Sequence, residues 1–219
     1  MAVNLTQYHS ILSQLEKAGA TLVAVSKTKP VEDIAALYEA GQRDFGENYV
    51  QELVDKAAAL PKDIRWHFIG HLQSNKVKYI APFVHLVHGV DSLRLLQEIG
   101  KQATKHNRCI DCLLQLHIAT EETKFGLSEN ELEELLNIVS ANPLTGVRIR
   151  GLMGMASFTS DEQAVQTEFH QLKHIFDRYG KGNWDILSMG MSGDYQLALA
   201  EGSTLVRIGS LLFGERDKN

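Results

Sequence analysis

Hydrophobic positions along this chain change period at regular intervals, and the first stretch has the period of a helix. Within residues 1–18, Leu5, Tyr8 and Leu12 recur at spacings of three and four, which places them on one face of a helix. Gly19 follows, and glycine commonly ends helices. The pattern therefore predicts an amphipathic helix over residues 1–18.

From residue 21 onward, short apolar runs rich in β-branched residues alternate with helical stretches. The predicted strands cover residues 21–26, 44–48, 65–70, 85–90, 109–118, 147–155, 186–190 and 205–213. The predicted helices between them cover residues 31–40, 49–60, 75–83, 92–106, 128–141, 161–179 and 194–200. Strands that alternate with helices form βαβ units and a parallel sheet, and eight such units point to a closed barrel.

We therefore predict an α/β fold, a (β/α)8 TIM-type barrel with an additional N-terminal helix. A single domain is expected over residues 1–219, with the barrel at about 20–216. After the last predicted strand only residues 214–219 remain, too few for an eighth outer helix. The N-terminal helix is expected to fill that gap or to cover an end of the barrel. The alternative is an open doubly wound sheet, which usually has fewer strands.

Composition and charge exclude several classes of protein. Hydrophobic residues make up 44% of the 219 residues, which is ordinary globular composition. The net charge of -5 leaves no basic stripe to neutralise phosphates, so we expect no nucleic-acid partner. No window approaches the roughly 18 apolar residues of a membrane span. The N-terminus lacks the basic and apolar regions of a signal peptide, which predicts a cytoplasmic protein without membrane contact.

Cysteine and histidine spacings predict no metal site. Cys109 and Cys112 form a lone C-x-x-C, with no second pair at ligand spacing, inside a run that favours a strand. Two small core residues are the preferred interpretation, against a redox pair or half a zinc site. His67 and His71 are four residues apart but straddle a strand end and a turn, so they make poor metal ligands.

Candidate chemistry lies at the C-terminal ends of the strands, where barrels of this kind place their active sites. Lys27 follows the first strand, and strand alternation puts it on the same face as Val23 and Val25. An inward lysine in apolar surroundings favours the neutral amine, the nucleophile that forms Schiff bases. A solvated lysine at a strand end is the alternative. Lys29 shares the parity but lies beyond the strand, which makes it a weaker candidate.

Small and hydroxyl-bearing residues follow the last two strands. They are Gly190, Ser192, Gly193, Gly209 and Ser210. Barrel proteins often bind a phosphate there, because glycine lets the backbone approach the oxygens and serine donates further hydrogen bonds. A helix cap and a tight turn would explain either loop alone. The two loops together favour a phosphate site.

Other polar residues are expected around the same mouth. Arg207 shares the inward face of the last strand and needs an acceptor, either a structural carboxylate or the nitrogen of a pyridine ring. Asn48, His71 and Asp91 follow the second, third and fourth strands and are candidates for supporting contacts. Met155 ends the sixth strand.

Several segments together resemble one protein family. They are AVSKTKP at 24–30, FGENY at 45–49, WHFIGHLQ at 66–73, KFG at 124–126, GLMGM at 151–155, LSMGMS at 187–192 and VRIGSLLFG at 206–214. In this order, from about residue 20 to 216, they resemble the pyridoxal phosphate homeostasis proteins. The resemblance implies a barrel like the N-terminal domain of alanine racemase. It also implies pyridoxal 5′-phosphate (PLP) held as a Schiff base on Lys27.

The resemblance further implies the contacts of the cofactor. It places the phosphate near Ser192, Gly209 and Ser210, and the ring nitrogen at Arg207. The predicted cofactor-binding set is completed by Asn48, His71 and Met155. One departure is Gly193, where members of the family often carry aspartate.

Function follows from what the chain lacks relative to alanine racemases. Those enzymes add a β-rich domain and a tyrosine base supplied across a dimer, and racemisation needs an acid/base group on each face of the substrate. Only Lys27 is identified here, and Arg207 would leave the ring nitrogen unprotonated. We therefore expect no catalytic residues and a protein that stores, buffers or delivers PLP and so affects amino-acid and keto-acid balance. The alternative is a small PLP-dependent enzyme, a racemase or lyase. Expected partners are PLP-dependent apoenzymes or regulatory proteins, with the chain itself a monomer.

Overall fold

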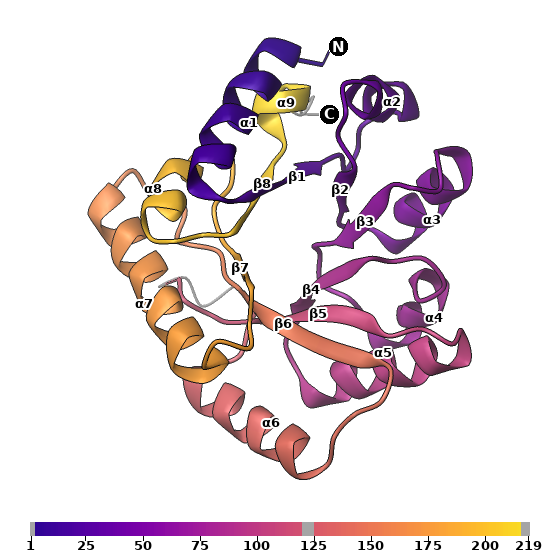
Figure 1. Ribbon diagram of the computed structural model, residues 1–219, viewed down its shortest axis with the longest axis vertical. Coiled ribbons are helices and arrows are strands. Elements are labelled where there is room, and N and C mark those ends of the chain that lie inside the picture. Colours follow the sequence, from indigo (N-terminus) through magenta and orange to yellow (C-terminus); the bar gives the residue numbers. More distant parts are fainter. Residues whose placement is uncertain (1–2, 120–124, 216–219) are drawn as a thin grey trace.

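Parallel strands close into a barrel in a computed structural model that describes residues 3–119 and 125–215. In these residues eight strands pair in sequence order, and the last pairs with the first (Figure 1). They are β1 (Thr21–Val25), β2 (Asp44–Glu47), β3 (Arg65–Phe68), β4 (Leu86–Val90), β5 (Ile110–Gln115), β6 (Val147–Met153), β7 (Ile186–Ser188) and β8 (Leu205–Ile208). The predicted barrel is confirmed, and the open doubly wound sheet is wrong.

Helices form a ring outside the strands (Figure 1). They are α1 (Leu5–Ala18), α2 (Val31–Glu39), α3 (Val50–Ala59), the 3-10 helix η1 (Ser74–Lys76), α4 (Val77–Ile80), α5 (Leu93–Lys105), α6 (Glu129–Ala141), α7 (Glu162–Gly180), α8 (Tyr195–Ala200) and α9 (Ser210–Phe213). The helix expected over 75–83 is thus split into two short pieces. Positions 1–2 of the predicted N-terminal helix and residue 216 lie outside the described residues, as does Lys124 of the KFG segment.

The N-terminal helix fills the gap in the outer ring. The side chain of Asn4 accepts a hydrogen bond from the backbone N–H of Gln7 at 3.0 Å, which caps α1, and Gly19 ends the helix at φ +66°. The backbone N–H of Asn4 donates to the Leu212 carbonyl at 2.9 Å, which joins α1 to α9. Figure 1 shows the two helices side by side, between α8 and α2.

The second half of the predicted last strand is wrong. β8 ends at Ile208, and the backbone N–H groups of Leu212 and Phe213 both donate to the carbonyl of Gly209, which forms the single turn of α9. Leu212 and Phe213 are buried in the outer core, so their apolar run covers α1 rather than extending the sheet. A short eighth outer helix therefore exists, where none was expected.

Two layers of buried side chains make the core. The larger lies between the strands and the helices, and the smaller fills the inside of the barrel. The inner layer consists of Val23, Leu86, Leu113, Met153 and Leu205. This plug separates an opening at the C-terminal ends of the strands from another at their N-terminal ends.

The two cysteines differ in burial. Cys112 is buried in the outer core, where burial raises the pKa of its thiol. Cys109 is exposed, because β5 begins only at Ile110. The core interpretation is therefore confirmed for Cys112 and wrong for Cys109. In the described part of the chain, no helix is both long and apolar enough to cross a membrane.

Candidate functional site

A cavity of about 550 Å³ opens at the C-terminal ends of the strands. Seven of the eight residues predicted for the cofactor line it. They are Lys27, Asn48, Met155, Ser192, Arg207, Gly209 and Ser210. They come from the ends of β1, β2, β6, β7 and β8, because the carboxyl ends of parallel strands meet at the same rim.

Strand alternation carries Lys27 into this cavity. Val23 belongs to the plug inside the barrel, and two residues further Val25 lines the cavity floor, followed by Lys27. Lys29 also lines the cavity, but its ammonium group donates to the backbone carbonyls of Phe213 at 2.9 Å and of Gly214 at 3.3 Å. Lys27 directly follows Ser26 just beyond the end of β1, whereas Lys29 reaches away to the backbone at the end of α9.

A buried ion cluster fixes the backbone on both sides of Lys27. Lys56 Nζ donates to the carbonyl of Ser26 at 2.7 Å and to the carboxylates of Glu47 at 2.8 Å and Glu52 at 2.6 Å. The Ser26 hydroxyl donates to the same oxygen of Glu47 at 2.6 Å. Burial raises the pKa of Glu47, and its hydrogen bonds from Lys56 and Ser26 oppose that rise.

The same cluster holds a strained turn after Lys27. Thr28 has φ +63°, a left-handed conformation that is unfavourable for a β-branched residue. Its backbone N–H donates to Glu52 at 2.6 Å, a charge-assisted bond that stabilises the turn. Lys56 and Glu52 were missed by the sequence analysis. The only signal was their i, i+4 spacing, which by itself indicates an ordinary pair on the surface of a helix.

The two loops predicted to bind phosphate lie against each other across the cavity wall. The hydroxyl oxygen of Ser192 accepts the backbone N–H of Gly209 at 3.2 Å. Among the described residues, the backbone N–H groups of Ser192, Gly193 and Ser210 donate to no protein acceptor. A phosphate is bound by backbone N–H groups and hydroxyls that have no other acceptor and that surround one cavity.

Gly193 leaves room in the phosphate loop. A Cβ atom added there would meet nothing within 4 Å, and its φ is not in the left-handed region. The aspartate that the family resemblance leads us to expect at this position would therefore have room for its Cβ without backbone strain. With glycine instead, the loop carries one negative charge fewer.

Arg207 forms a buried wall of the cavity. Its Nη1 donates to the Ser188 hydroxyl at 2.6 Å and its Nη2 to the Gly154 carbonyl at 3.2 Å. Burial lowers its pKa to about 10, and the negative charge of Asp194 opposes that shift, so the guanidinium stays protonated at neutral pH. No carboxylate among the described residues forms an ion pair with it. The structural carboxylate considered from the sequence is thus not found there.

A chain of buried side chains continues from Arg207 down the inside of the barrel. Ser188 Oγ lies 3.0 Å from His88 Nδ1, and His88 Nε2 lies 2.9 Å from His67 Nδ1. His67 Nε2 lies 3.0 Å from Asp44 Oδ1, at the far end of the barrel. Hydrogen bonds thus cross the whole plug.

The charge of Asp44 sets the direction of these hydrogen bonds. Burial raises the pKa of Asp44, but hydrogen bonds from His67 and Arg65 outweigh that effect and hold the pKa at about 2. A carboxylate only accepts, so His67 donates from Nε2, and in the tautomer with its one proton there Nδ1 accepts from His88 Nε2. Burial lowers the pKa of His88 and keeps it neutral, so its Nδ1 accepts from the hydroxyl of Ser188. The Ser188 oxygen is then left to accept from Arg207, which orients the guanidinium.

Asn48 adds an unused acceptor to the cavity. Its side-chain oxygen is buried and has no hydrogen-bond partner within the described residues. A buried acceptor without a donor costs free energy, and a polar ligand would supply the donor. Apolar contacts come from Met155 and from two residues that the sequence analysis missed, Ile69 and Met191. A single apolar residue in a loop carries no sequence signal of its own.

His71 is not brought into this cavity. Its Nδ1 lies 3.4 Å from a carboxylate oxygen of Asp91, and its ring stacks on Phe125 with centroids 4.4 Å apart. Both His71 and Asp91 line a separate surface pocket. Ile69 lines the cavity, and β3 ends at Phe68, so strand alternation does not fix the direction of His71; its contact with the cofactor stays a prediction.

Comparisons with known proteins identify the family. The family model described as alanine racemase, N-terminal domain, matches residues 4–217. The pyridoxal phosphate homeostasis protein of Aquifex aeolicus strain VF5 is 41% identical over 211 residues, 92% of this chain and 91% of its own length. The protein of the same name from Escherichia coli K12 is 41% identical over 205 residues, 90% of this chain and 86% of its own. The chain belongs to the pyridoxal phosphate homeostasis protein family.

Solved structures agree with this membership. PipY of Synechococcus elongatus PCC7942, solved with PLP bound, superposes on this family member with a TM-score of 0.87 at 36% identity, over 95% of this chain and 99% of PipY. Alanine racemase of Clostridium difficile 630 gives a TM-score of 0.77 at 15% identity, over 100% of this chain and 59% of the racemase. The racemase shares the fold alone. The resemblance drawn from the sequence motifs is confirmed.

Proposed function

We propose that this protein binds PLP in the cavity at the C-terminal ends of the strands, as a Schiff base on Lys27. It stores, buffers or delivers the cofactor and so affects the balance of amino acids and keto acids. The observation that carries the proposal is the convergence in one cavity of Lys27, unused backbone donors at Ser192 and Ser210, and the Arg207 guanidinium. The names of its relatives and the PLP bound to PipY support the same conclusion.

Each group has one role toward the cofactor, which supplies an electrophilic aldehyde when bound. Lys27 attaches it, and the loops at Ser192 and Ser210 bind its phosphate. Arg207 donates to its ring nitrogen and, having no acceptor atom, holds that nitrogen unprotonated. Asn48 supplies an acceptor for a hydroxyl group. A contact between His71 and the bound cofactor is also proposed.

Borohydride reduction is expected to attach a pyridoxyl group to Lys27. Reduction makes the bond between the amine and the cofactor permanent, so digestion and peptide mapping locate it. The Lys27→Ala variant should lose the label and the yellow colour of bound PLP. The matched control is Lys29→Ala, two residues away on the same cavity wall, which should keep both. A label found at Lys29 in the parent protein would overturn the assignment.

The site is built to hold a cofactor rather than to turn over substrate. The described lining of the cavity contains no His, Tyr or Cys, and its ionisable side chains besides Lys27 are Lys29, whose ammonium group is held by backbone carbonyls, Asp194 and Arg207. Arg207 keeps the ring nitrogen neutral, and a neutral pyridine is a poor sink for the electrons of a carbanion. Both features favour a PLP carrier over a racemase or lyase.

The PLP-loaded protein is expected to exchange the α-proton of alanine slowly and not to interconvert L- and D-alanine. Proton exchange with deuterated solvent, followed by NMR, measures this. Arg207→Glu should speed the exchange, because a carboxyl group there favours a protonated ring nitrogen. Rapid interconversion of both enantiomers by the parent protein would establish the enzyme instead. An unchanged exchange rate and absorption spectrum in PLP-loaded Arg207→Glu would show that Arg207 does not face the ring.

The proposal extends to partners and setting. Every group assigned to PLP comes from one chain, so a monomer suffices for binding. Free cysteines, one of them exposed, suit the reducing cytoplasm. PLP-dependent apoenzymes or regulatory proteins are the partners that delivery or buffering requires.

A further inference from the structure

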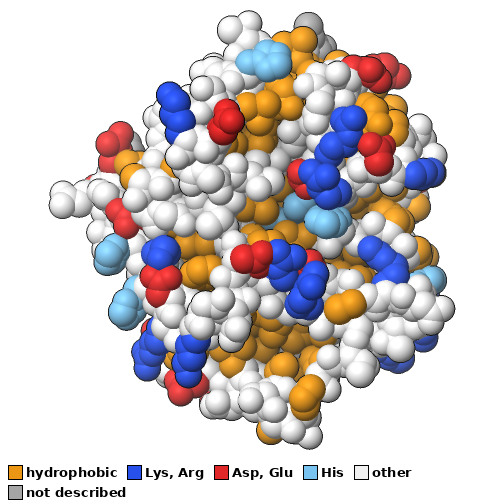
Figure 2. Space-filling model, viewed as in Figure 1, with side chains coloured by type: hydrophobic (Ala, Val, Ile, Leu, Met, Phe, Trp, Pro, Cys, Tyr) orange, Lys and Arg blue, Asp and Glu red, His pale blue; other side chains and the backbone are white. Residues whose placement is uncertain are grey.

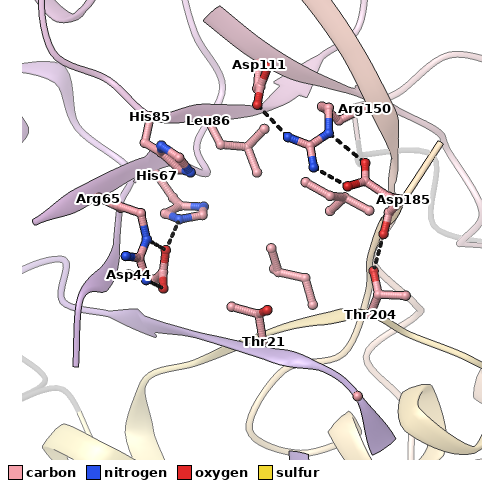
Figure 3. A pocket seen from close by; sticks show the side chains of 13 residues that line it. Thr21, Asp44, Arg65, His67, His85, Leu86, Asp111, Arg150, Asp185 and Thr204 are labelled. Carbon is pink, nitrogen blue, oxygen red and sulfur yellow. Dashed lines mark hydrogen bonds and ion pairs between the residues drawn. The ribbon is translucent and has the colours of Figure 1, made fainter. Parts of the chain in front are cut away.

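Metal-binding side chains converge at the opposite end of the barrel from the proposed PLP site. The N-terminal ends of the strands surround a pocket of about 330 Å³. Figure 2 shows histidine and charged side chains gathered at the middle of one face of the barrel. Within the pocket, His67 and His85 lie side by side and Asp44 lies next to His67 (Figure 3).

The spacing of these three side chains suits a single ion. Their nearest ligand atoms all lie within 4.8 Å of one another. His67 Nε2 and Asp44 Oδ1 are 3.0 Å apart, close to the separation of about 3.3 Å expected for two ligands bound to one zinc ion. His85 is exposed and directly precedes β4, so its side chain has room to turn toward the other two ligands.

The surrounding hydrogen bonds hold two of the ligands in position. The second ring nitrogen of His67 is tied to His88 Nε2 at 2.9 Å, which leaves His67 Nε2 facing the opening. Histidine ligands of metals are commonly held in this way through their other nitrogen. Arg65 Nε and Nη2 bind the two carboxylate oxygens of Asp44 at 2.7 and 2.5 Å. Asp44 Oδ1 accepts from both Arg65 Nε and His67 Nε2, so a bound ion takes the place of those two donors while Oδ2 stays on Arg65 Nη2.

We propose that Asp44, His67 and His85 form a binding site for a divalent transition-metal ion of the class of Zn²⁺, Ni²⁺ or Cu²⁺. Two imidazoles with one carboxylate favour these ions over Mg²⁺ and Ca²⁺, which prefer oxygen ligands. The pocket is open to solvent, so water completes the coordination. The site is separate in space from Lys27 and the proposed PLP site, because the plug of the barrel lies between them, and the hydrogen bonds from Asp44 to Arg207 connect the two.

Sequence spacing could not reveal this site. The histidine pair with suggestive spacing, His67 and His71, was judged a poor ligand pair, and the two line different pockets: His67 in β3 lines this one, and His71 beyond β3 lines another. The true neighbours of His67 come from the starts of β2 and β4, and the register of the sheet brings them together.

A metal titration tests the proposal. The full chain, produced without a histidine tag and dialysed free of small molecules, is titrated with Zn²⁺ by calorimetry. We expect saturable binding of one equivalent, and none of Mg²⁺ at the same concentrations. His85→Ala, at the exposed rim, should weaken Zn²⁺ binding by at least about tenfold, since it loses a direct ligand. Circular dichroism confirms that the variant is folded.

The matched control is His170→Ala, a histidine on α7 that pairs with Glu201 outside the pocket. It should bind Zn²⁺ as the parent does. Equal affinity of the parent and His85→Ala, or no saturable binding by the parent, would overturn the proposal.

Nitrogen NMR of the imidazole rings gives a second measurement. Without metal, His67 should carry its proton on Nε2, where it donates to Asp44. Bound Zn²⁺ takes Nε2, so the proton must move to Nδ1 and the hydrogen bond to His88 must reverse direction. A proton that stays on Nε2 at saturating Zn²⁺ would exclude His67 as a ligand.

Discussion

Pyridoxal, which lacks the phosphate, is expected to bind at least about a hundredfold more weakly than PLP. Two charge-assisted hydrogen bonds of about 1.5–3 kcal/mol each account for that factor, since 1.4 kcal/mol is tenfold in affinity. The donors are the unused backbone N–H groups and hydroxyls at Ser192 and Ser210. Equilibrium dialysis with each compound measures the ratio directly.

Single variants locate the phosphate within the cavity. Ser192→Ala and Ser210→Ala should each raise the dissociation constant of PLP by about tenfold, while the affinity for pyridoxal stays unchanged. Ser140→Ala, on the exposed face of α6, is the matched control and should change neither value. Equal affinities of the parent for pyridoxal and PLP would show that the phosphate lies elsewhere.

Lys56→Met is expected to lower the free energy of unfolding by about 3–5 kcal/mol, the usual cost of removing one partner of a buried ion pair. Glu47 is 0% exposed, and one of its carboxylate oxygens already lacks a hydrogen-bond partner in the described residues. Without Lys56 its charge is buried and uncompensated. Urea unfolding measures the loss. Because Lys56 also binds the carbonyl of Ser26, the residue before Lys27, PLP affinity should fall as well.

The pH dependence of the stability of Lys56→Met shows whether the lost charge or the lost packing of Lys56 causes the deficit. An unpaired Glu47 has a folded-state pKa raised further above its unfolded value, so the folded variant takes up a proton as the pH falls. The deficit of Lys56→Met relative to the parent should therefore be larger at pH 8 than at pH 5. Adding Glu47→Gln should restore part of the stability. Lys101→Met, an exposed lysine on α5, should stay within about 0.5 kcal/mol of the parent. A deficit independent of pH would mean that lost packing causes it.

Local periodicity was enough to predict the barrel and the residues at its C-terminal rim. Val23, Val25 and Lys27 face inward because side chains alternate along any strand, wherever that strand lies. The Ser192 and Ser210 loops meet because parallel strands end at one rim. Both features depend only on neighbouring residues and on the fold class, so they can be predicted from a sequence pattern.

The chain departs from its local pattern where its path leaves a regular element. The alternation of β3 ends with the strand, and His71, two residues beyond Ile69, lies next to Asp91. Residues 210–213 have the composition of a strand, and packing against α1 makes them a helix instead. In both places tertiary contacts outweigh local preference.

Only the tertiary structure determined the hydrogen-bond partners of the buried polar groups. Lys56 reaches the carbonyl of Ser26 across 30 positions of the chain, and His88 reaches Ser188 across 100. His67 meets Asp44 through the register of β2 and β3. A buried polar side chain must find a partner, but its sequence neighbours on a strand point to the opposite face. The partner therefore comes from another strand or helix, and only closure of the barrel determines which one.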